Sequence, residues 1–363
     1  MTTPRMTAPL PTGMRRIDDF DGARNAPEPA ARLNEVRKRA QAFRERFMDE
    51  PEVAFYRSLD LVRVPYPTWY AYTGVFAQSG FKFPFVHILN RLFVLQYKDF
   101  EGVLRTLLFS PSDVEGNRET PFFRRLSDRM PGSRKVQDLF APVLRDVAKA
   151  LAEIGISPAQ VDYISYDHLH TQDVRSWLGS DSQAGFFPKA KLLVHQQEWI
   201  STTRLLPCQA DWYCPGGIHG LPADRIVPFE GSLALGPGVA LLHTPGHTEG
   251  NHSLAARVPD GIRVTSENGV GADAYAPQNS RVNAVRRYAQ STGVEVILNG
   301  NTLENSNDQY ISMVLEKTVA GPSVNPDYPN CAPSSECTPG WVTPGIQVSY
   351  LMGEAEFGAP RQG

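Results

Sequence analysis

Two histidines and a carboxylate stand close together where the chain reads Asp167-His-Leu-His-Thr-Gln-Asp173. The residues just before them, 161–166, are mostly apolar or aromatic and are typical of a strand. His168 and His170 are two residues apart, so on an extended segment both imidazoles can reach one cation about 2.0–2.1 Å away. The following loop can fold Asp173 back beside them. This pattern predicts a metal site; the alternative is a pair of histidines at a strand end that only satisfy their own hydrogen bonds.

A second stretch favours the metal site. Residues 239–242 form an apolar run typical of a strand, and His243-Thr-Pro-Gly-His247-Thr-Glu-Gly follows. The Pro-Gly turn aims His247 off the tip of that strand before the chain resumes as strand through Ser253. The sequence therefore offers three histidines, each at or near the end of a predicted strand.

Together, His-x-His after a strand and the later Thr-Pro-Gly-His-Thr-x-Gly with its Ser resemble the metallo-β-lactamase superfamily of zinc hydrolases. The resemblance implies an α/β fold, a four-layer αβ/βα sandwich with two mixed sheets inside and helices outside. It also implies that the first zinc ligands are His168, His170 and His247. All three ligands of that first site are present.

The departures from the family pattern concern the second metal site. The usual first motif is His-x-His-x-Asp-His, but here Gln172 stands in the carboxylate position and Asp173 in that of the third histidine. Glu267 is the closest match to the family's bridging carboxylate, with Asp273 in reserve, and Asn301 replaces the last histidine. A site built from Asp173, Glu267 and Asn301 is oxygen-rich and suits zinc less well than imidazole does. We expect one catalytic Zn²⁺, and a second metal weakly bound or absent.

The implied chemistry is hydrolytic. Three neutral imidazoles leave the charge of the ion largely uncompensated, which lowers the pKa of a bound water to about 7 and yields a metal-bound hydroxide. Asp173 is expected to orient that water or to take its proton, and Glu267 to fix a histidine ring. Asn301 is expected to donate a hydrogen bond to the substrate or to the developing negative charge.

The substrate is predicted from a narrower resemblance over residues 59–345, to a branch of hydrolytic dehalogenases that act on chlorothalonil, a polychlorinated aromatic dinitrile. It implies attack on an electron-poor chloroaromatic ring with release of chloride. Such a flat substrate needs an aromatic pocket, although each candidate aromatic residue is also a natural core residue. The candidates are Trp177, Trp199, Trp212, Tyr213 and the aromatic cluster of residues 66–85, namely Tyr66, Trp69, Tyr70, Tyr72, Phe76, Phe81, Phe83 and Phe85. The alternatives are a lactone or ester hydrolase, and a degenerate domain kept for binding.

Composition excludes several other classes. The chain has 363 residues, 41% of them hydrophobic, and a formal charge of −3, so it can bury a large core and carries no electrostatic signature of nucleic-acid binding. No 18-residue apolar span occurs, and residues 1–22 lack the apolar segment of a secretory signal. We expect a cytoplasmic homodimer that acts on a small aromatic or lactone-like molecule and binds neither nucleic acid nor membrane.

The predicted organisation is an N-terminal arm over residues 1–58, partly disordered with one helix, a catalytic domain over residues 59–320, and a Pro/Gly-rich tail over residues 321–363. Within the domain we expect a helix starting at Pro142 and a strand over residues 294–298. Residues 205–220 are either a lid near the metal or a surface insertion. The four cysteines allow free thiols, disulfides or a structural metal: Cys208, Cys214, Cys331 and Cys337.

Overall fold

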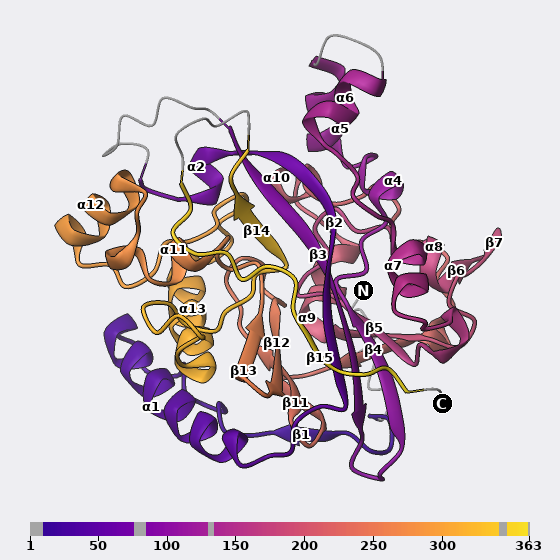
Figure 1. The fold of residues 1–363 in the computed structure, drawn as a ribbon, viewed down its shortest axis with the longest axis horizontal. Helices are drawn as coiled ribbons and strands as arrows, with labels where there is room; N and C mark the ends of the chain where they lie inside the picture. The colour runs from indigo at the N-terminus through magenta and orange to yellow at the C-terminus, as the bar shows by residue number, and fades with distance from the viewer. Residues whose placement is uncertain (1–9, 76–84, 130–133, 341–346, 362–363) are drawn as a thin grey trace.

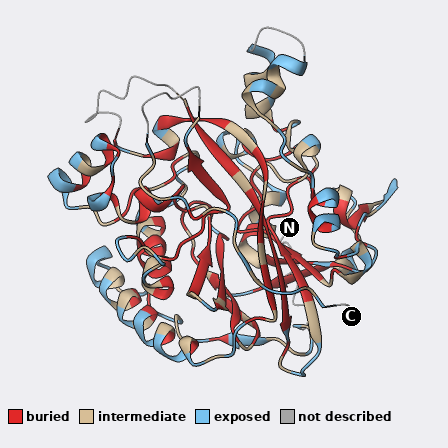
Figure 2. Ribbon diagram, in the orientation of Figure 1, coloured by how far each residue is buried: buried red, intermediate tan, exposed pale blue. Residues whose placement is uncertain are grey.

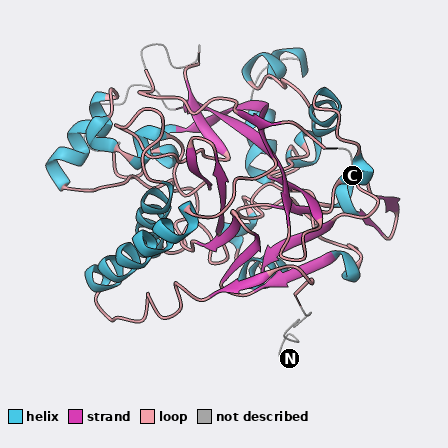
Figure 3. Ribbon diagram, turned by 60° about the horizontal axis from the view of Figure 1, so that its bottom comes forward, coloured by secondary structure: helices cyan, strands magenta, loops and turns pink. Residues whose placement is uncertain are grey.

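The computed structural model describes residues 10–75, 85–129, 134–340 and 347–361. Two main β-sheets lie in its centre, and helices cover their outer sides (Figures 1 and 3). This arrangement confirms the α/β sandwich predicted from the sequence. None of the helices in these described ranges is long and apolar enough to cross a membrane.

The larger sheet has the strand order β15-β2-β3-β4-β5-β8-β9, and β14 pairs with the first part of β3, beyond the end of β4. Its β2–β3 hairpin is antiparallel, whereas β4, β5, β8 and β9 run parallel. The strands of this sheet are β2 (Phe55–Pro67), β3 (Phe85–Lys98), β4 (Leu104–Phe109), β5 (Tyr163–Ser165), β8 (Lys191–His195), β9 (Ile226–Phe229), β14 (Ser335–Thr338) and β15 (Glu356–Gly358).

The smaller sheet has the order β1-β10-β11-β12-β13, and all its pairings are antiparallel. Its strands are β1 (Arg15–Ile17), β10 (Ser232–Gly236), β11 (Val239–His243), β12 (His252–Val258) and β13 (Gly261–Thr265). A separate short hairpin joins β6 (Gly179–Ser180) to β7 (Gln183–Ala184).

The core between the sheets follows from the two-residue period of β-strands. On β3, Phe93, Leu95 and Tyr97 belong to the cluster that also contains Leu233 and Leu241 of the smaller sheet. Their sequence neighbours on the same strands belong to a second cluster, which packs under the helices. Alternate residues therefore face opposite layers, and this explains why both sheets are buried on both sides (Figure 2).

The outer layers are helical. Helix α1 (Pro29–Met48) packs beside α13 (Ser306–Ala320), which lies against β13, while α7 (Val147–Glu153) packs on β2 and α9 (Gln196–Thr203) on β8. The other α-helices are α2 (Thr68–Ala71), α4 (Val114–Asn117), α5 (Pro121–Arg129), α6 (Arg134–Phe140), α8 (Arg175–Leu178), α10 (Pro207–Ala210), α11 (Ala272–Tyr275) and α12 (Asn283–Thr292). Short 3₁₀ turns occur at Pro158–Gln160, Ala223–Arg225 and Pro277–Asn279.

Both terminal segments take part in this architecture. Strand β1, from the predicted arm, pairs with β10, and Arg24 bonds to Asp308 and Ser312 of α13. Strands β14 and β15, from the predicted tail, extend the larger sheet. The domain boundaries at residues 58 and 320 stay a prediction. In the part of the chain that the structure describes, the segments before and after them both pack on the two sheets.

Two predicted elements are wrong. The helix expected from Pro142 begins only at Val147, because Val143 bridges to Val62 of β2 and the Asp146 side chain caps the helix by accepting from the Lys149 N–H at 2.7 Å. The strand expected over residues 294–298 is irregular. Its backbone groups bond to scattered partners, such as the Ile297 N–H to the carbonyl of residue 274, and not to a neighbouring strand.

Of the three alternatives for the cysteines, the structure agrees with free thiols. Cys208 is exposed, while Cys214, Cys331 and Cys337 are buried, and all four are free thiols. Burial raises the pKa of Cys337 to about 12 and that of Cys214 to about 11. The buried thiols are therefore protonated and behave as small apolar side chains.

Candidate metal centre

The three histidines come from loops of different sheets. His168 and His170 lie in the loop after β5 of the larger sheet, and His247 lies in the turn between β11 and β12 of the smaller one. The backbone N–H of His252 donates to the Asp167 carbonyl at 2.9 Å and joins the two loops directly. The site therefore exists only because the two sheets meet at this edge.

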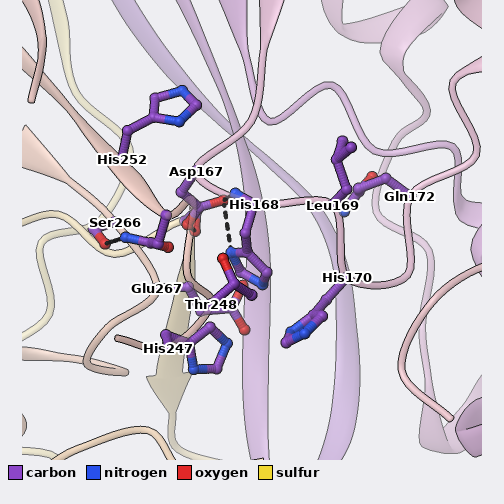
Figure 4. Close-up of polar contacts among 12 residues, drawn as sticks. Asp167, His168, Leu169, His170, Gln172, His247, Thr248, His252, Ser266 and Glu267 are labelled. Atoms are coloured by element: carbon purple, nitrogen blue, oxygen red, sulfur yellow. Dashed lines mark hydrogen bonds and ion pairs between the residues drawn. The ribbon is translucent and has the colours of Figure 1, made fainter. Parts of the chain in front are cut away.

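The three imidazoles converge as predicted. One ring nitrogen of each lies within 4.8 Å of those of the other two, and the ring centroids of His168 lie 4.5 Å from His170 and 4.6 Å from His247. All three side chains are at most 4% exposed. Figure 4 shows them gathered around one point, with Asp167 behind His168 and Glu267 beside them. A buried cluster of imidazoles is the arrangement expected for zinc.

The contacts of two of the rings, His247 and His168, also fit a metal. His247 Nδ1 lies 3.2 Å from the Asn299 carbonyl, so it carries the hydrogen, and the buried Nε2 has no hydrogen-bond partner among the described residues. His168 Nδ1 makes no hydrogen bond within the described residues, but it lies at ion-pair distance, 3.4 Å, from Asp167 Oδ1, on the side away from the other histidines. Metal-ligating histidines usually pass their second nitrogen to a carbonyl or carboxylate in this way.

The charges of the site follow from burial and from Asp167. Burial, together with His168, lowers the pKa of His247 to about 3 and that of His170 well below its usual value. Burial also acts on His168, but the Asp167 carboxylate outweighs it and raises the pKa of that ring to about 9. Two of the imidazoles are therefore neutral, as metal ligands must be, and a bound dication would displace the proton of the third.

Asp167 is a site residue that we did not predict. Its Oδ1 faces His168, while Oδ2 accepts a hydrogen bond of 2.6 Å from Oγ of Ser334, the residue directly before β14. It also belongs with His168 and Glu267 to a second group of possible metal ligands. Its place next to His168 in the sequence was a signal, but the contact with Ser334 joins residues far apart in the chain.

Glu267 lies near His168 and Asn301 near His170, while their expected roles stay a prediction. Both line a cavity of about 310 Å³, which we term the site cavity, and His170 lines it too. Asn301 Nδ2 lies 3.3 Å from His170 Nδ1. Burial raises the pKa of Glu267 to about 7, and a bound cation would lower it again. A carboxyl group and an amide therefore flank the histidines on the side of the site cavity.

Asp173 does not join them, and this contradicts its expected roles as a ligand and as a base. Thr171 has a φ of 64°, a left-handed conformation that turns the chain after His170. The Asp173 carboxylate then forms an ion pair with Arg175, with contacts of 2.5 and 2.9 Å, and is not among the residues that line the site cavity. The second metal site predicted from Asp173, Glu267 and Asn301 thus lacks one of its three ligands.

A substitution tests whether Asp173 is a metal ligand or base, or only an ion-pair partner of Arg175. Asp173→Asn is expected to leave zinc content and turnover nearly unchanged, because the carboxylate faces Arg175, and to lower the free energy of unfolding by about 1–2 kcal/mol. Zinc analysis, steady-state kinetics and urea unfolding measure the three quantities. Asp181→Asn, at an exposed carboxylate of the β6–β7 hairpin, is the control. Loss of zinc in step with activity would instead make Asp173 a ligand.

Part of the predicted aromatic wall is present. Tyr66 and Trp212, both predicted candidates, line the site cavity together with Phe123, which was not predicted. The Trp212 ring stacks on Phe122 with ring centroids 4.2 Å apart. Trp212 is also the residue through which the segment 205–220 reaches this cavity. The other candidates Trp177, Trp199 and Tyr213 pack in or against the core. Phe76, Phe81 and Phe83 lie outside the described residues.

Comparisons with known proteins agree on the fold. No protein-family model and no curated protein matches the chain. The structure is similar to that of a probable metal-dependent hydrolase from Staphylococcus aureus, with a TM-score of 0.50 and 11% identity over 72% of this chain and 83% of that one. This likeness shows that the two proteins share the metallo-β-lactamase type of fold, and nothing beyond the fold.

Two lactone-cleaving enzymes are similar at lower scores. AidC, a dizinc quorum-quenching lactonase, has a TM-score of 0.48 and 10% identity over 86% of this chain and 97% of its own. An N-acyl homoserine lactone hydrolase has a TM-score of 0.44 and 16% identity over 68% of this chain and 91% of its own. Scores at this level carry no argument about the substrate of the present protein.

Proposed function

We propose that this protein is a zinc-dependent hydrolase of the metallo-β-lactamase superfamily, with one catalytic zinc held by His168, His170 and His247. The observation that carries the proposal is the convergence of three buried imidazoles, two of them neutral, beside the site cavity. A degenerate binding domain would have no need to keep this arrangement. The departure of Asp173 and the replacement of the last histidine by Asn301 support a single ion.

The roles of the protein groups follow from their positions. Zinc, when bound, supplies a Lewis acid that lowers the pKa of a coordinated water to about 7. Glu267, which lines the site cavity next to the histidines, takes the role first expected of Asp173 and accepts the proton of the attacking water at a carboxylate oxygen. Asn301 Nδ2 donates a hydrogen bond to the negative charge that develops on the substrate.

The substrate class is proposed from the cavity wall. The volume of the site cavity, about 310 Å³, lies at the lower end of the range for small-molecule sites. Tyr66, Phe123 and Trp212 offer aromatic surface to a flat, apolar substrate. This favours an electron-poor chloroaromatic such as chlorothalonil. Water oxygen adds to a ring carbon, chloride leaves with the electron pair of the broken carbon–chlorine bond, and Glu267 receives the proton. Hydrolysis of a lactone or ester, at a carbonyl carbon, is the second candidate.

One experiment tests the proposal. The purified protein is analysed for zinc, which we expect at about one equivalent, and assayed with chlorothalonil, a lactone panel and aryl esters. Chloride release is followed for the first substrate and acid release for the others. Samples stripped with a chelator, and stripped samples reloaded with zinc, serve as controls, with activity expected to disappear and return.

The outcomes distinguish the alternatives. Chloride release favours the dehalogenase, whereas turnover of lactones or esters alone makes the second candidate correct. Zinc without turnover of any substrate contradicts the enzymatic proposal and favours a binding domain. A protein that binds no zinc overturns the metal centre, and two fully occupied ions overturn the single-zinc assignment.

A further inference from the structure

Glu198 is a buried carboxylate that the proposed chemistry does not use. It lies in the first turn of α9, is 0% exposed, and forms no ion pair within the described part of the chain. Burying a carboxylate without a cation is costly unless several donors satisfy it. The groups that donate hydrogen bonds to Glu198 therefore indicate its structural role.

Its donors come from both histidine loops. The backbone N–H of Leu169, between His168 and His170, donates to Glu198 Oε1 at 2.8 Å. Thr248 Oγ1, directly after His247, donates to Oε2 at 2.6 Å. One carboxylate thus holds a group adjacent to each of the three histidines.

A third donor comes from Tyr213, whose hydroxyl lies 3.2 Å from Glu198 Oε1. The Tyr213 ring packs edge-on against the ring of His170, with centroids 4.8 Å apart, so the same contact supports that ring. We term Glu198 with Leu169, Tyr213 and Thr248 the Glu198 clamp.

The loop that carries His247 also packs closely on α9. A Cβ placed on Gly250, three residues after His247, would lie 2.0 Å from the Glu198 backbone nitrogen. The His247 loop therefore rests directly on the first turn of α9. Because α9 follows β8 at once, with His195 as its N-cap, the larger sheet fixes where Glu198 stands.

We propose that Glu198 is the positioning residue that sets zinc affinity, by locking the loop of His168 and His170 to the loop of His247 through the Glu198 clamp. The inference rests on the metal centre of the proposed function and adds a determinant outside the ligand set. A metal site binds tightly when its ligands are already in place, and loss of an orienting partner typically costs 10–100-fold in affinity.

The test compares two substitutions at Glu198. Glu198→Ala removes the acceptors, and we expect zinc affinity to fall about 10–100-fold. Glu198→Gln keeps the length and one acceptor oxygen, and its amide can donate to Thr248 Oγ1, so we expect affinity close to that of the unchanged protein. Affinity is measured by competition with a chromogenic chelator, and far-UV circular dichroism checks that each variant is folded.

Two further variants complete the design. Glu249→Ala is the matched control, because Glu249 also bonds to α9, through Gln197 and Ser201, but is exposed, so its zinc affinity should not change. Thr248→Val removes one donor and leaves the carboxylate. It should bind zinc several-fold more weakly, and it keeps the proposal testable if Glu198→Ala does not fold.

The results separate this inference from the metal centre itself. Unchanged affinity in folded Glu198→Ala, or in Thr248→Val, overturns the Glu198 clamp while leaving the zinc site intact. A Gln variant as weak as the Ala variant also overturns it, because the hydrogen bonds would then not be the cause. If the unchanged protein binds no zinc, the proposed function fails and this inference fails with it.

Discussion

Replacing His247 by alanine is expected to reduce bound zinc from about one equivalent to nearly none, and turnover by roughly 10³-fold or more. His247 is one of the three imidazoles that converge, and its Nδ1 is held by the Asn299 carbonyl with Nε2 left free for the ion. A bound metal contributes several kcal/mol to the stabilisation of the transition state, and each 1.36 kcal/mol is a factor of ten. Elemental analysis after dialysis and steady-state kinetics measure both effects.

The control is His219→Ala, at an exposed histidine that is neither in the group of three histidines nor in the lining of the site cavity, which should keep its zinc and its activity. Unfolding of the metal-free forms shows whether the His247 variant is intact. Full zinc stoichiometry in His247→Ala would mean that the ligands are wrongly assigned.

Glu336→Ala is expected to lower the free energy of unfolding by about 3–5 kcal/mol. Arg91 is 1% exposed, and its guanidinium lies 2.7 Å from Asp60 and 2.9 Å from Glu336. Without Glu336 the buried cation keeps only one carboxylate, and the backbone N–H of Met352 loses its acceptor at 2.7 Å. Urea unfolding, extrapolated to water, measures the loss.

Glu356→Ala provides the comparison. Glu356 pairs with Arg57 at 2.9 Å, but its side chain is 52% exposed, and exposed pairs contribute only about 0–1 kcal/mol. If the two variants lost the same free energy of unfolding, the burial of Arg91 would not be what makes its ion pair with Glu336 important. Because β14 carries Glu336 and begins beside Ser334, the Glu336 variant should also hold Asp167 less firmly.

The convergence of the three histidines could be predicted from the sequence because each motif is local. His168 and His170 are two positions apart on an extended segment, and a Pro-Gly turn places His247 at the tip of its strand. The period of apolar residues likewise indicates the inward faces of β3 and β11, since side chains of a strand alternate between its two sides. These features depend on neighbours along the chain, so a sequence contains them.

Local patterns failed where distant backbone groups compete. The segment 142–146 has helical apolar spacing, but Val143 pairs with Val62. Asp173 matches a ligand position of the family motif, yet the left-handed Thr171 turns it toward Arg175. In both places a contact or a single backbone angle overrides a pattern that is correct for an isolated segment.

The contacts of the groups around the three histidines were decided by the tertiary structure. Asp167 adjoins a histidine in the sequence, but only the packing of β14 brings Ser334 to its other oxygen. Glu198 carries no motif, and becomes a common acceptor for two loops because α9 begins between them. A histidine that can bind a metal is recognised from its own side chain and its local motif. A residue that orients such a histidine is recognised only from its place in the folded chain, and this place depends on how the two sheets pack.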